Sequence, residues 1–384
     1  MIALIRVDFN VPVHKGKILD LTRIKAAIPT IEHCLQSGMS VVLMSHFGRP
    51  KGLDRSLSLK LLIEPLSKLL KQKVCFYSSI TKKGDEKTQN LNPGTVVLLE
   101  NLRFYSGEIA NDLLFAKKLA TYGDIYINDA FGASHRDHAS ISAIKTFFTA
   151  ETKFKGLLLH KELKELNKLK TARSPYTVIV GGAKIGSKIH ILKSFLNIAD
   201  NILIGGGMAF PFIKELGGEI GRSLCSKLEL DVVKEFLIKS KNSKTKIVLP
   251  LDCLTTTSLN KTSELITTEI NSVPKKSLGV DIGEKTISLY NKIILASKSI
   301  IWNGPMGITE IEPFSSGTRQ ISNSMVRATK NGAYTLIGGG DTISDVSRFG
   351  VKNEFSYICT GGGAMLEFFR ANKLATTLDL KKLK

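Results

Sequence analysis

Residues 176–188 read YTVIVGGAKIGSK, a run of β-branched and aromatic residues that ends in two glycines. Such a short apolar run predicts a buried strand, and the glycines predict a tight turn into a following helix. The end of the stretch nearly matches the phosphate-binding loop G-x-x-x-x-G-K-[ST], but Ser187 precedes Lys188 and Ile189 follows it. The stretch therefore predicts a strand, a glycine turn and a helix, and it leaves open which phosphate the turn would hold.

The same pattern, an apolar run that ends in glycines, recurs through the second half of the chain. One such turn can serve only for close packing. Several of them at the carboxyl ends of strands indicate a floor for a phosphorylated ligand, because helix N-termini favour anions. The segments are TVIVGGAK (177–184), ILIGGGMAF (202–210), SIIWNGPMG (299–307), TLIGGGDT (335–342) and YICTGGGA (357–364).

The first half also alternates short apolar runs with amphipathic stretches, which is typical of βαβ units around a parallel sheet. A chain of 384 residues is too long for one ordinary core. We therefore expect the α/β class, with two doubly wound parallel-sheet (Rossmann-like) domains. The apolar runs are LIRVDFNV (4–11), SVVLMSH (40–46), KVCFY (73–77), TVVLLE (95–100) and DIYINDA (124–130).

Leucines at helical spacing across residues 153–173 predict one amphipathic helix that joins the two domains. From periodicity alone, an ordinary peripheral helix explains the pattern equally well. The stretch 255–277 is expected to be a loop. We expect a substrate domain at 1–155, a connector at 156–173, a nucleotide domain at 174–372, and a tail at 373–384 that returns to the first domain.

The strand ends of the first half carry polar and basic residues, with few apolar residues that could line a hydrophobic pocket. Arginine suits these positions because its planar guanidinium forms bidentate hydrogen bonds with carboxylate and phosphate groups. For any single residue a strand-end salt bridge explains the position as well, but the set favours a small, polyanionic, hydroxylated metabolite. Its members are Asp8, Asn10, Arg23, His46, Arg49, Arg103, His135 and Arg136.

The net charge of +20 invites a nucleic-acid reading. The charge is spread over many lysines, and we find neither an RNP motif nor a helix-turn-helix signature, so we expect no specific nucleic-acid partner.

The five cysteines show no metal-ligand spacing. No apolar stretch approaches the roughly 20 residues of a membrane span, and Arg6 and Asp8 interrupt the only candidate for a signal peptide. We expect a soluble cytoplasmic protein without a membrane partner.

A phosphate-binding half and a basic half together suggest phosphoryl transfer between a nucleotide and a small acid. Such transfer needs mainly positioning and charge neutralisation, which Lys, Arg, Mg²⁺ and helix N-termini supply. The histidines lack an evident Ser or Cys partner for covalent catalysis, so direct transfer is the simpler mechanism.

Ten segments give the chain a resemblance to the phosphoglycerate kinases, in the same order and across essentially its whole length. The resemblance implies reversible transfer of the acyl phosphate of 1,3-bisphosphoglycerate to ADP, giving 3-phosphoglycerate and ATP, with Mg²⁺ and by a monomer. The segments are IRVDFNVP (5–12), DLTRI (20–24), SHFGRP (45–50), ENLRF (100–104), DAFGASHRDHAS (129–140), GGAKIGSKI (181–189), IGGGMAF (204–210), WNGPMG (302–307), IGGGDT (337–342) and TGGGA (360–364).

The resemblance also implies roles for individual residues. Arg23 would neutralise charge on the transferring group, and Lys184 would stabilise the phosphoryl in flight, together with Gly340 and Gly363. Asp341 would hold Mg²⁺, although a helix cap is an alternative for it. The phosphoglycerate would be held by Asp8, Asn10, Arg23, His46, Arg49, Arg103 and Arg136. The nucleotide would be held by Lys188, Gly206, Gly207, Gly279, Asn303, Glu310, Gly339, Gly340, Asp341 and Thr342.

The chain departs from the usual family pattern in three places. It begins almost at its first predicted strand, Ser187 stands where Asp is common, and Thr309 replaces an aromatic residue before Glu310.

Two other functional classes remain open. A nicotinamide-dependent dehydrogenase would need G-x-G-x-x-G after a strand, whereas these glycines are mostly consecutive. A catalytically silent binding protein would share the same motifs.

Overall fold

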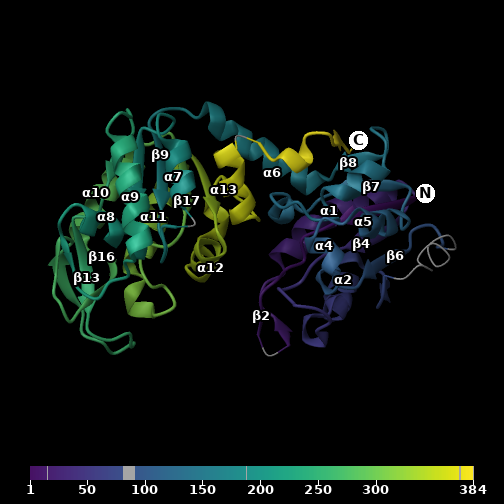
Figure 1. Cartoon of the computed structure of the whole chain (residues 1–384), viewed down its shortest axis with the longest axis horizontal. Coiled ribbons are helices and arrows are strands. Elements are labelled where there is room, and N and C mark those ends of the chain that lie inside the picture. The colour runs from purple at the N-terminus through teal and green to yellow at the C-terminus, as the bar shows by residue number, and fades with distance from the viewer. Residues whose placement is uncertain (15, 81–90, 187, 372, 384) are drawn as a thin grey trace. The chain divides into compact units, whose positions relative to one another are not determined.

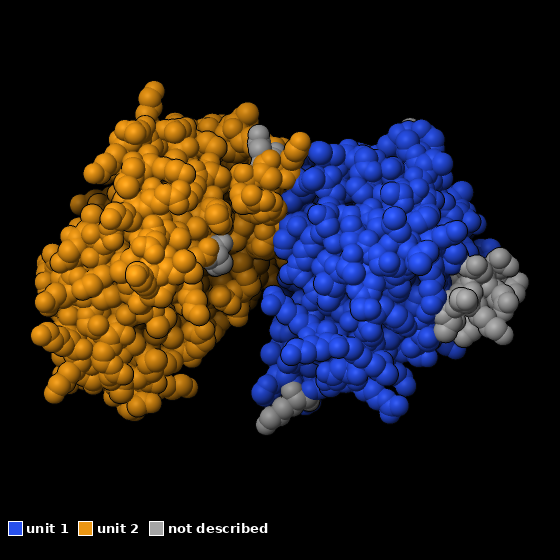
Figure 2. Space-filling model, viewed as in Figure 1, with its two compact units in different colours: residues 1–165, 374–384 blue, residues 166–373 orange. Residues whose placement is uncertain are grey.

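The computed structural model describes residues 1–14, 16–80, 91–186, 188–371 and 373–383. The chain divides into two compact units (Figure 2). Unit 1 comprises residues Met1–Glu165 and Leu374–Lys384, and unit 2 comprises Leu166–Lys373. In the described part of the chain, no helix is both long and apolar enough to cross a bilayer.

Unit 1 is built on a parallel sheet with strand order β20-β8-β7-β1-β4-β6-β5. Strand β1 lies near the middle, where Leu4 pairs with Val42 on one side and with Tyr126 on the other. The chain is wound in both directions from this strand, as in doubly wound folds. The strands are β1 Ile2–Arg6, β4 Ser40–Met44, β5 Val74–Tyr77, β6 Val96–Leu99, β7 Ile125–Asn128, β8 Lys153–Lys155 and β20 Lys381–Lys382.

Helices cover this sheet, and a short hairpin precedes the first of them (Figure 1). The core on one face joins Ile5, Leu43 and Leu98 of the sheet to Ile31 and Leu66 of the helices. The helices are α1 Thr22–Gln36, α2 Ile63–Leu70, α4 Ser106–Ile109 and α5 Leu113–Ala120, and the hairpin pairs β2 Val13–His14 with β3 Lys17–Ile18.

Unit 2 repeats the plan with a parallel sheet of order β12-β10-β9-β17-β18-β19. Its middle strands are buried along their whole length, and Trp302 of β17 is fully buried. This explains their unbroken apolar runs, since a parallel sheet covered on both faces has no solvent side. The strands are β9 Tyr176–Val180, β10 Asn201–Ile204, β12 Lys246–Val248, β17 Ser299–Asn303, β18 Tyr334–Gly338 and β19 Tyr357–Ile358.

The helices of unit 2 follow these strands (Figure 1). Helix α9 begins with a capping box, in which Ser226 and Glu229 bind each other's backbone N–H groups. The helices are α7 Ile189–Phe195, α8 Phe210–Glu215, α9 Lys227–Ser240, α10 Glu284–Ala296, α11 Ser316–Lys330, α12 Gly340–Arg348 and α13 Gly362–Ala371.

Two local features differ from the sequence-based expectation. The stretch expected as a loop at 255–277 contributes to a small antiparallel sheet of order β14-β13-β16, with β13 at Asp252–Thr256, β14 at Ile266–Glu269 and β16 at Leu278–Ile282. It also contains β15 (Ser272–Val273), which pairs with β11 (Glu219–Ile220). Threonines and serines give these strands too little apolar alternation to stand out from a loop.

The connector helix is shorter than the leucine spacing predicts. Helix α6 spans Leu157–Lys168 and is followed by one 3₁₀ turn, Leu169–Thr171. Residues Lys153–Lys155 form strand β8 instead, paired with β7 and with β20 near the C-terminus. The strand pairing of Lys153–Lys155 with β7 and β20 outweighed the helical spacing of the leucines in this stretch. Helix α6 begins in unit 1 and ends in unit 2.

Candidate functional site

The predicted substrate residues of unit 1 follow the carboxyl ends of neighbouring parallel strands. Asp8 and Asn10 come after β1, His46 and Arg49 after β4, and Arg136 after β7. Arg103 lies in a 3₁₀ turn after β6, and Arg23 lies in the first turn of α1. Because parallel strands end at one edge of the sheet, the fold gathers these side chains there.

Asp8 and Asn10 organise this edge through hydrogen bonds. The Arg23 guanidinium donates from Nη1 to Asp8 Oδ2 at 2.9 Å and to the Asn10 carbonyl at 3.1 Å. The Asn10 side-chain oxygen accepts from the Gly48 backbone N–H at 2.9 Å. These bonds tie the loop after β1 to α1 and to the loop after β4, and they fix the orientation of Arg23.

Asn101 is a structural member of this site that sequence reasoning did not single out. Its Oδ1 accepts from the backbone N–H groups of Phe47 and Arg103, both at 3.1 Å. Its Nδ2 donates to the carbonyls of Phe47 at 2.7 Å and Leu57 at 2.9 Å. Asn101 thereby joins the loop that carries His46 and Arg49 to the turn that carries Arg103. Asn101 lies inside the ENLRF segment, and this was the feature of the sequence that could have identified it.

The cations of this edge disfavour one another's charged forms. Burial, and after it the charges of Arg136 and Arg6, lowers the pKa of Arg103 to about 10. Burial, followed by Arg49, lowers the pKa of Arg136. Among the described residues, the buried Nε of Arg103 has no hydrogen-bond partner. The edge is therefore short of negative charge, and a multiply charged anion would relieve the repulsion.

In unit 2 the predicted glycine turns interlock at the carboxyl ends of β9, β10 and β17. The Gly182 N–H donates to the Pro305 carbonyl at 2.8 Å, and the Gly206 N–H donates to the Met306 carbonyl at 3.1 Å. Gly206 has φ +65°, and a Cβ there would lie 2.6 Å from the Gly182 nitrogen. Only glycine permits this approach, so the turns form a close-packed floor.

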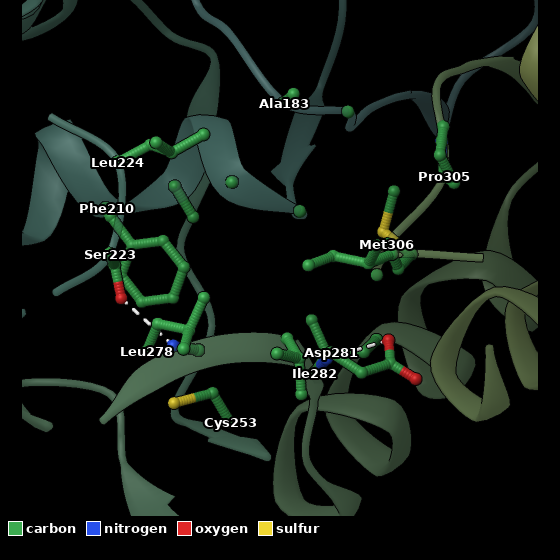
Figure 3. Close-up of a pocket in the computed structure, with 18 of the residues that line it drawn as sticks. Ala183, Phe210, Ser223, Leu224, Cys253, Leu278, Asp281, Ile282, Pro305 and Met306 are labelled. Carbon is green, nitrogen blue, oxygen red and sulfur yellow. Dashed lines mark hydrogen bonds between the residues drawn. The ribbon is translucent and has the colours of Figure 1, made fainter. Parts of the chain in front are cut away.

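A cavity of about 300 Å³ lies beside this floor (Figure 3). Figure 3 shows Phe210 and Leu278 on one side and Met306 on the other. The Ser223 hydroxyl accepts from the Gly279 N–H at 3.0 Å, and a Cβ at Gly279 would collide with the Phe210 ring. The walls are mostly apolar, with Glu310 and Asp341 among the lining residues. The cavity therefore suits a flat, uncharged ring with polar groups near Glu310 and Asp341.

Two helix N-termini meet at the edge of β18. Helices α12 and α13 begin at Gly340 and Gly362, and a Cβ at Gly362 would lie 2.7 Å from the Cα of Gly339. Unlike α9, α12 has no side-chain cap from the residues that the structure describes, so its first N–H groups are available to an anion. Thr342 Oγ1 accepts from the Gly304 N–H at 2.7 Å and holds the loop after β17 against α12.

Asn303 adds an unused donor at this place. Its Nδ2 is buried and makes no hydrogen bond within the ranges that the structure describes. The side chain lies against Gly339, where a Cβ would stand 3.2 Å from Nδ2. Gly363 follows in the first turn of α13. Asn303, α12 and α13 thus offer donors from three adjoining elements.

The two lysines of the turn after β9 differ in their surroundings. Lys184 is exposed. Lys188 donates from Nζ to the Gly181 carbonyl at 2.6 Å and to the Asn303 carbonyl at 3.3 Å, and so links the two turns. Burial lowers the pKa of Lys188 to about 8, and the Asp341 carboxylate partly opposes this shift. Ser187, noted as a departure from the family pattern, lies outside the described residues.

The donors around Asp341 fit Mg²⁺ bound together with a phosphate ligand. The Asp341 carboxylate is exposed in the first turn of α12. Across the described ranges, no group of three or more His, Cys, Asp or Glu side chains could enclose a metal ion. Mg²⁺ commonly uses one or two carboxylates and completes its shell with phosphate oxygens and water. A single carboxylate beside available N–H groups matches that preference.

Two further residues concern the predicted nucleotide region. Asp281, which sequence reasoning did not single out, is buried at the cavity and accepts from the N–H groups of Gly317 at 2.7 Å and Ile282 at 2.9 Å. Burial raises its pKa to about 7, against the effect of these bonds. Thr309 is 5% exposed, so the position that is usually aromatic in the family is here a packed, smaller residue.

Comparison with known proteins relates the chain to the phosphoglycerate kinases. The family model for phosphoglycerate kinase matches residues 2–372. The phosphoglycerate kinase of Thermosipho africanus (strain TCF52B) is 43% identical over 390 residues, which cover 99% of this chain and 96% of that protein. Two solved phosphoglycerate kinases superpose with a TM-score of 0.84. The structure from Coxiella burnetii shares 34% identity over 98% of this chain and 95% of its own, and the structure from Pyrococcus horikoshii OT3 shares 30% over 99% and 95%. The chain belongs to the phosphoglycerate kinase family.

Proposed function

We propose that this chain catalyses reversible, Mg²⁺-dependent transfer of the acyl phosphate of 1,3-bisphosphoglycerate to ADP, giving 3-phosphoglycerate and ATP in glycolysis. The observation that carries the proposal is the family match across residues 2–372. The cation-rich edge of unit 1 and the glycine floor of unit 2 support it, because they suit the two different substrates. We further propose that the enzyme acts in the cytoplasm as a monomer.

The phosphoglycerate would bind unit 1 at the edge where arginines repel one another. Arg49, Arg103 and Arg136 would supply forked donors to the phosphate and carboxylate oxygens. Arg23, held by Asp8 and Asn10, would neutralise charge on the transferring group. His46 would donate a hydrogen bond from its ring. A bound polyanion would raise the depressed pKa values of Arg103 and Arg136, which links charge relief to affinity.

The nucleotide would bind unit 2, with its base in the cavity beside Phe210, Gly206, Gly207 and Gly279 and its ribose toward Glu310. The phosphates would lie over the uncapped start of α12 and the first turn of α13. Gly339, Gly340, Gly363 and the Asn303 amide offer N–H donors there, Thr342 fixes the adjoining loop, and Lys188 adds a positive charge. Mg²⁺ held by Asp341 would neutralise charge on the phosphate oxygens.

Transfer would proceed directly from one substrate to the other. In-line attack needs the reacting atoms within about 3 to 3.5 Å, so the ligand of unit 1 must be brought to the ligand of unit 2 by domain closure. The exposed Lys184 would then meet the charge that develops on the phosphoryl group, and α12 and α13 would present N–H groups to the same oxygens. These donors would replace water in solvating that charge.

The test measures ATP directly. Purified chain is mixed with 1,3-bisphosphoglycerate, ADP and Mg²⁺, and ATP is read by luminescence, with each component omitted in turn. ATP that appears only in the complete mixture supports the proposal. No ATP from a folded chain that binds both substrates would indicate a silent binding protein. Oxidation of NADH without any need for ADP or ATP would favour a dehydrogenase.

A further inference from the structure

Arg6 belongs to the first predicted motif, yet its surroundings differ from those of the other arginines in unit 1. Its side chain is fully buried, whereas Arg49 is exposed. Its Nε donates to Ser140 Oγ at 2.8 Å, and Nη1 donates to the Val7 carbonyl. Its Nη2 lies 3.1 Å from His46 Nδ1. Each of the three nitrogens of Arg6 therefore has a protein partner.

A buried carboxylate balances the charge of Arg6. Glu108 Oε1 lies 3.9 Å from Arg6 Nη2, and both side chains are 0% exposed. The same carboxylate accepts from the Ser140 N–H at 3.0 Å and from the Ser140 hydroxyl at 2.7 Å. His138 Nδ1 lies 3.6 Å from Glu108 Oε1. Glu108 and Ser140 thus hold the guanidinium in one orientation, so Arg6 cannot turn toward a ligand without breaking a buried pair.

The contact with His46 determines which ring nitrogen carries a proton. Arginine has only donors, so Nδ1 of His46 must accept and cannot hold a proton. The proton of the neutral ring then lies on Nε2. A second proton is disfavoured as well, because burial and then the charges of Arg6, Arg103, Arg136 and Arg23 lower the pKa of His46 well below 6.5. These cations come from β1, the turn after β6, the loop after β7 and α1.

We infer that Arg6 is a positioning residue that keeps His46 neutral with its proton on Nε2, so that His46 meets the phosphoglycerate as a hydrogen-bond donor and not as a further cation. This inference rests on the proposed function for the identity of the ligand. It separates Arg6 from Arg49, Arg103 and Arg136, which would contact the substrate themselves. It also explains why a fully buried ion pair lies beneath a substrate-binding edge.

The first experiment needs no substrate and no variant of Arg6. The ¹⁵N resonances of histidine-labelled chain are recorded across the pH range, and His46→Gln assigns the His46 signals. We expect an unprotonated Nδ1, a protonated Nε2 and no titration near the ordinary histidine value of about 6.5. A protonated Nδ1, or titration near that value, would overturn the inference whether or not the chain makes ATP.

The second experiment uses a double-mutant cycle to test whether Arg6 acts through His46. Arg6→Lys keeps the charge beside Glu108 but loses the fork that reaches both Ser140 and His46. We expect it to raise KM for 3-phosphoglycerate about tenfold, the effect of one charge-assisted hydrogen bond, with kcat and KM for ATP little changed. In a His46→Gln background the same change should add almost nothing. Independent effects in the two backgrounds would show that Arg6 does not act through His46. Should Arg6→Lys fail to fold, the resonances of the unaltered chain still decide the tautomer.

Discussion

Lys184 and Lys188 stand four residues apart in one turn, yet the fold gives them opposite surroundings. Lys184 is exposed, whereas Lys188 is held against the carbonyls of Gly181 and Asn303. An exposed lysine keeps its hydration until a ligand displaces it, while a partly buried lysine has already lost some of its hydration. The two residues should therefore affect different quantities: the rate of transfer for Lys184 and the pH dependence of nucleotide binding for Lys188.

Replacing Lys184 should slow the chemical step. If the ammonium meets charge that develops only during transfer, Lys184→Met should lower kcat about 10²- to 10³-fold, the range for loss of one such donor. The affinity for ADP, measured by calorimetry, should change little because the ground state lacks that charge. An unaltered kcat in steady-state assays would remove Lys184 from the chemistry.

The lowered pKa of Lys188 should make ADP binding depend on pH. Lys188 in the free chain loses its proton as the pH rises through about 8, and the charged form favours phosphate. The affinity for ADP should therefore weaken between about pH 7.5 and 9. Lys188→Arg should abolish this dependence because arginine stays charged, whereas Lys184→Met should retain it. An equal dependence in the Lys188→Arg variant would contradict the assignment.

The same shift also affects folding stability. The unfolded chain holds the Lys188 proton up to about 10.5, while the folded chain releases it at about 8. Between these values the unfolded state binds more protons, so the contribution of Lys188 to the free energy of unfolding rises with pH. Below about 8 the partly desolvated charge of Lys188 is a constant cost to the folded state.

At the scale of elements, the proposed nucleotide site depends on how closely the strand-end turns pack. Gly206→Ala would force a side chain into the left-handed region at φ +65° and place Cβ 2.6 Å from the Gly182 nitrogen. We expect it to lower the free energy of unfolding by about 2 kcal/mol or more, measured by denaturant titration.

A matched control lies in the neighbouring turn. A Cβ at Gly186 would meet nothing within 4 Å of the described structure, so Gly186→Ala should leave the stability nearly unchanged. Equal stability of the two variants would show that the floor can relax, and that the close packing of the turns after β9 and β10 does not hold the site together.

At the scale of the whole molecule, the charge of +20 could attract any polyanion. Local recognition should nevertheless exceed this general field. Arg49→Lys should weaken 3-phosphoglycerate binding about tenfold while leaving ADP affinity unchanged, because lysine keeps the charge but loses the fork. Replacing Lys234, Lys239 and Lys244 together should affect neither ligand. Calorimetric titrations with equal losses for both ligands, or larger losses from the lysine set, would favour a nonspecific electrostatic model.

Direct transfer between ligands held by different units predicts a change in the shape of the molecule. Either substrate alone contacts mainly one unit and gains little from a closed state, whereas both together can shift the population. Small-angle X-ray scattering should therefore show clear compaction only in the ternary complex with Mg²⁺, with α6 and the segments beside it as hinge. Full compaction with ADP alone, or none in the ternary complex, would refute the bridging mechanism.

The sequence by itself determined the two parallel-sheet units and their strand-end motifs. Apolar runs, helical spacing and turn glycines are local signals, and in parallel sheets they dictate which loops reach the ligand edge. The family resemblance then added roles for those loops, which remain proposals for the individual residues.

The tertiary structure decided the features that depend on distant segments. Residues Lys153–Lys155 became a strand because β7 and β20 pair with them, and residues within 255–277 became strands for the same kind of reason. Arg6 and Arg49 look alike in the sequence, since both occupy short motifs at strand ends. Only Arg6 is covered, by Ser140, Glu108 and His46. Burial and tautomer follow from such nonlocal packing, because the free energy of a charge depends on the atoms around it and not on its neighbours in the chain.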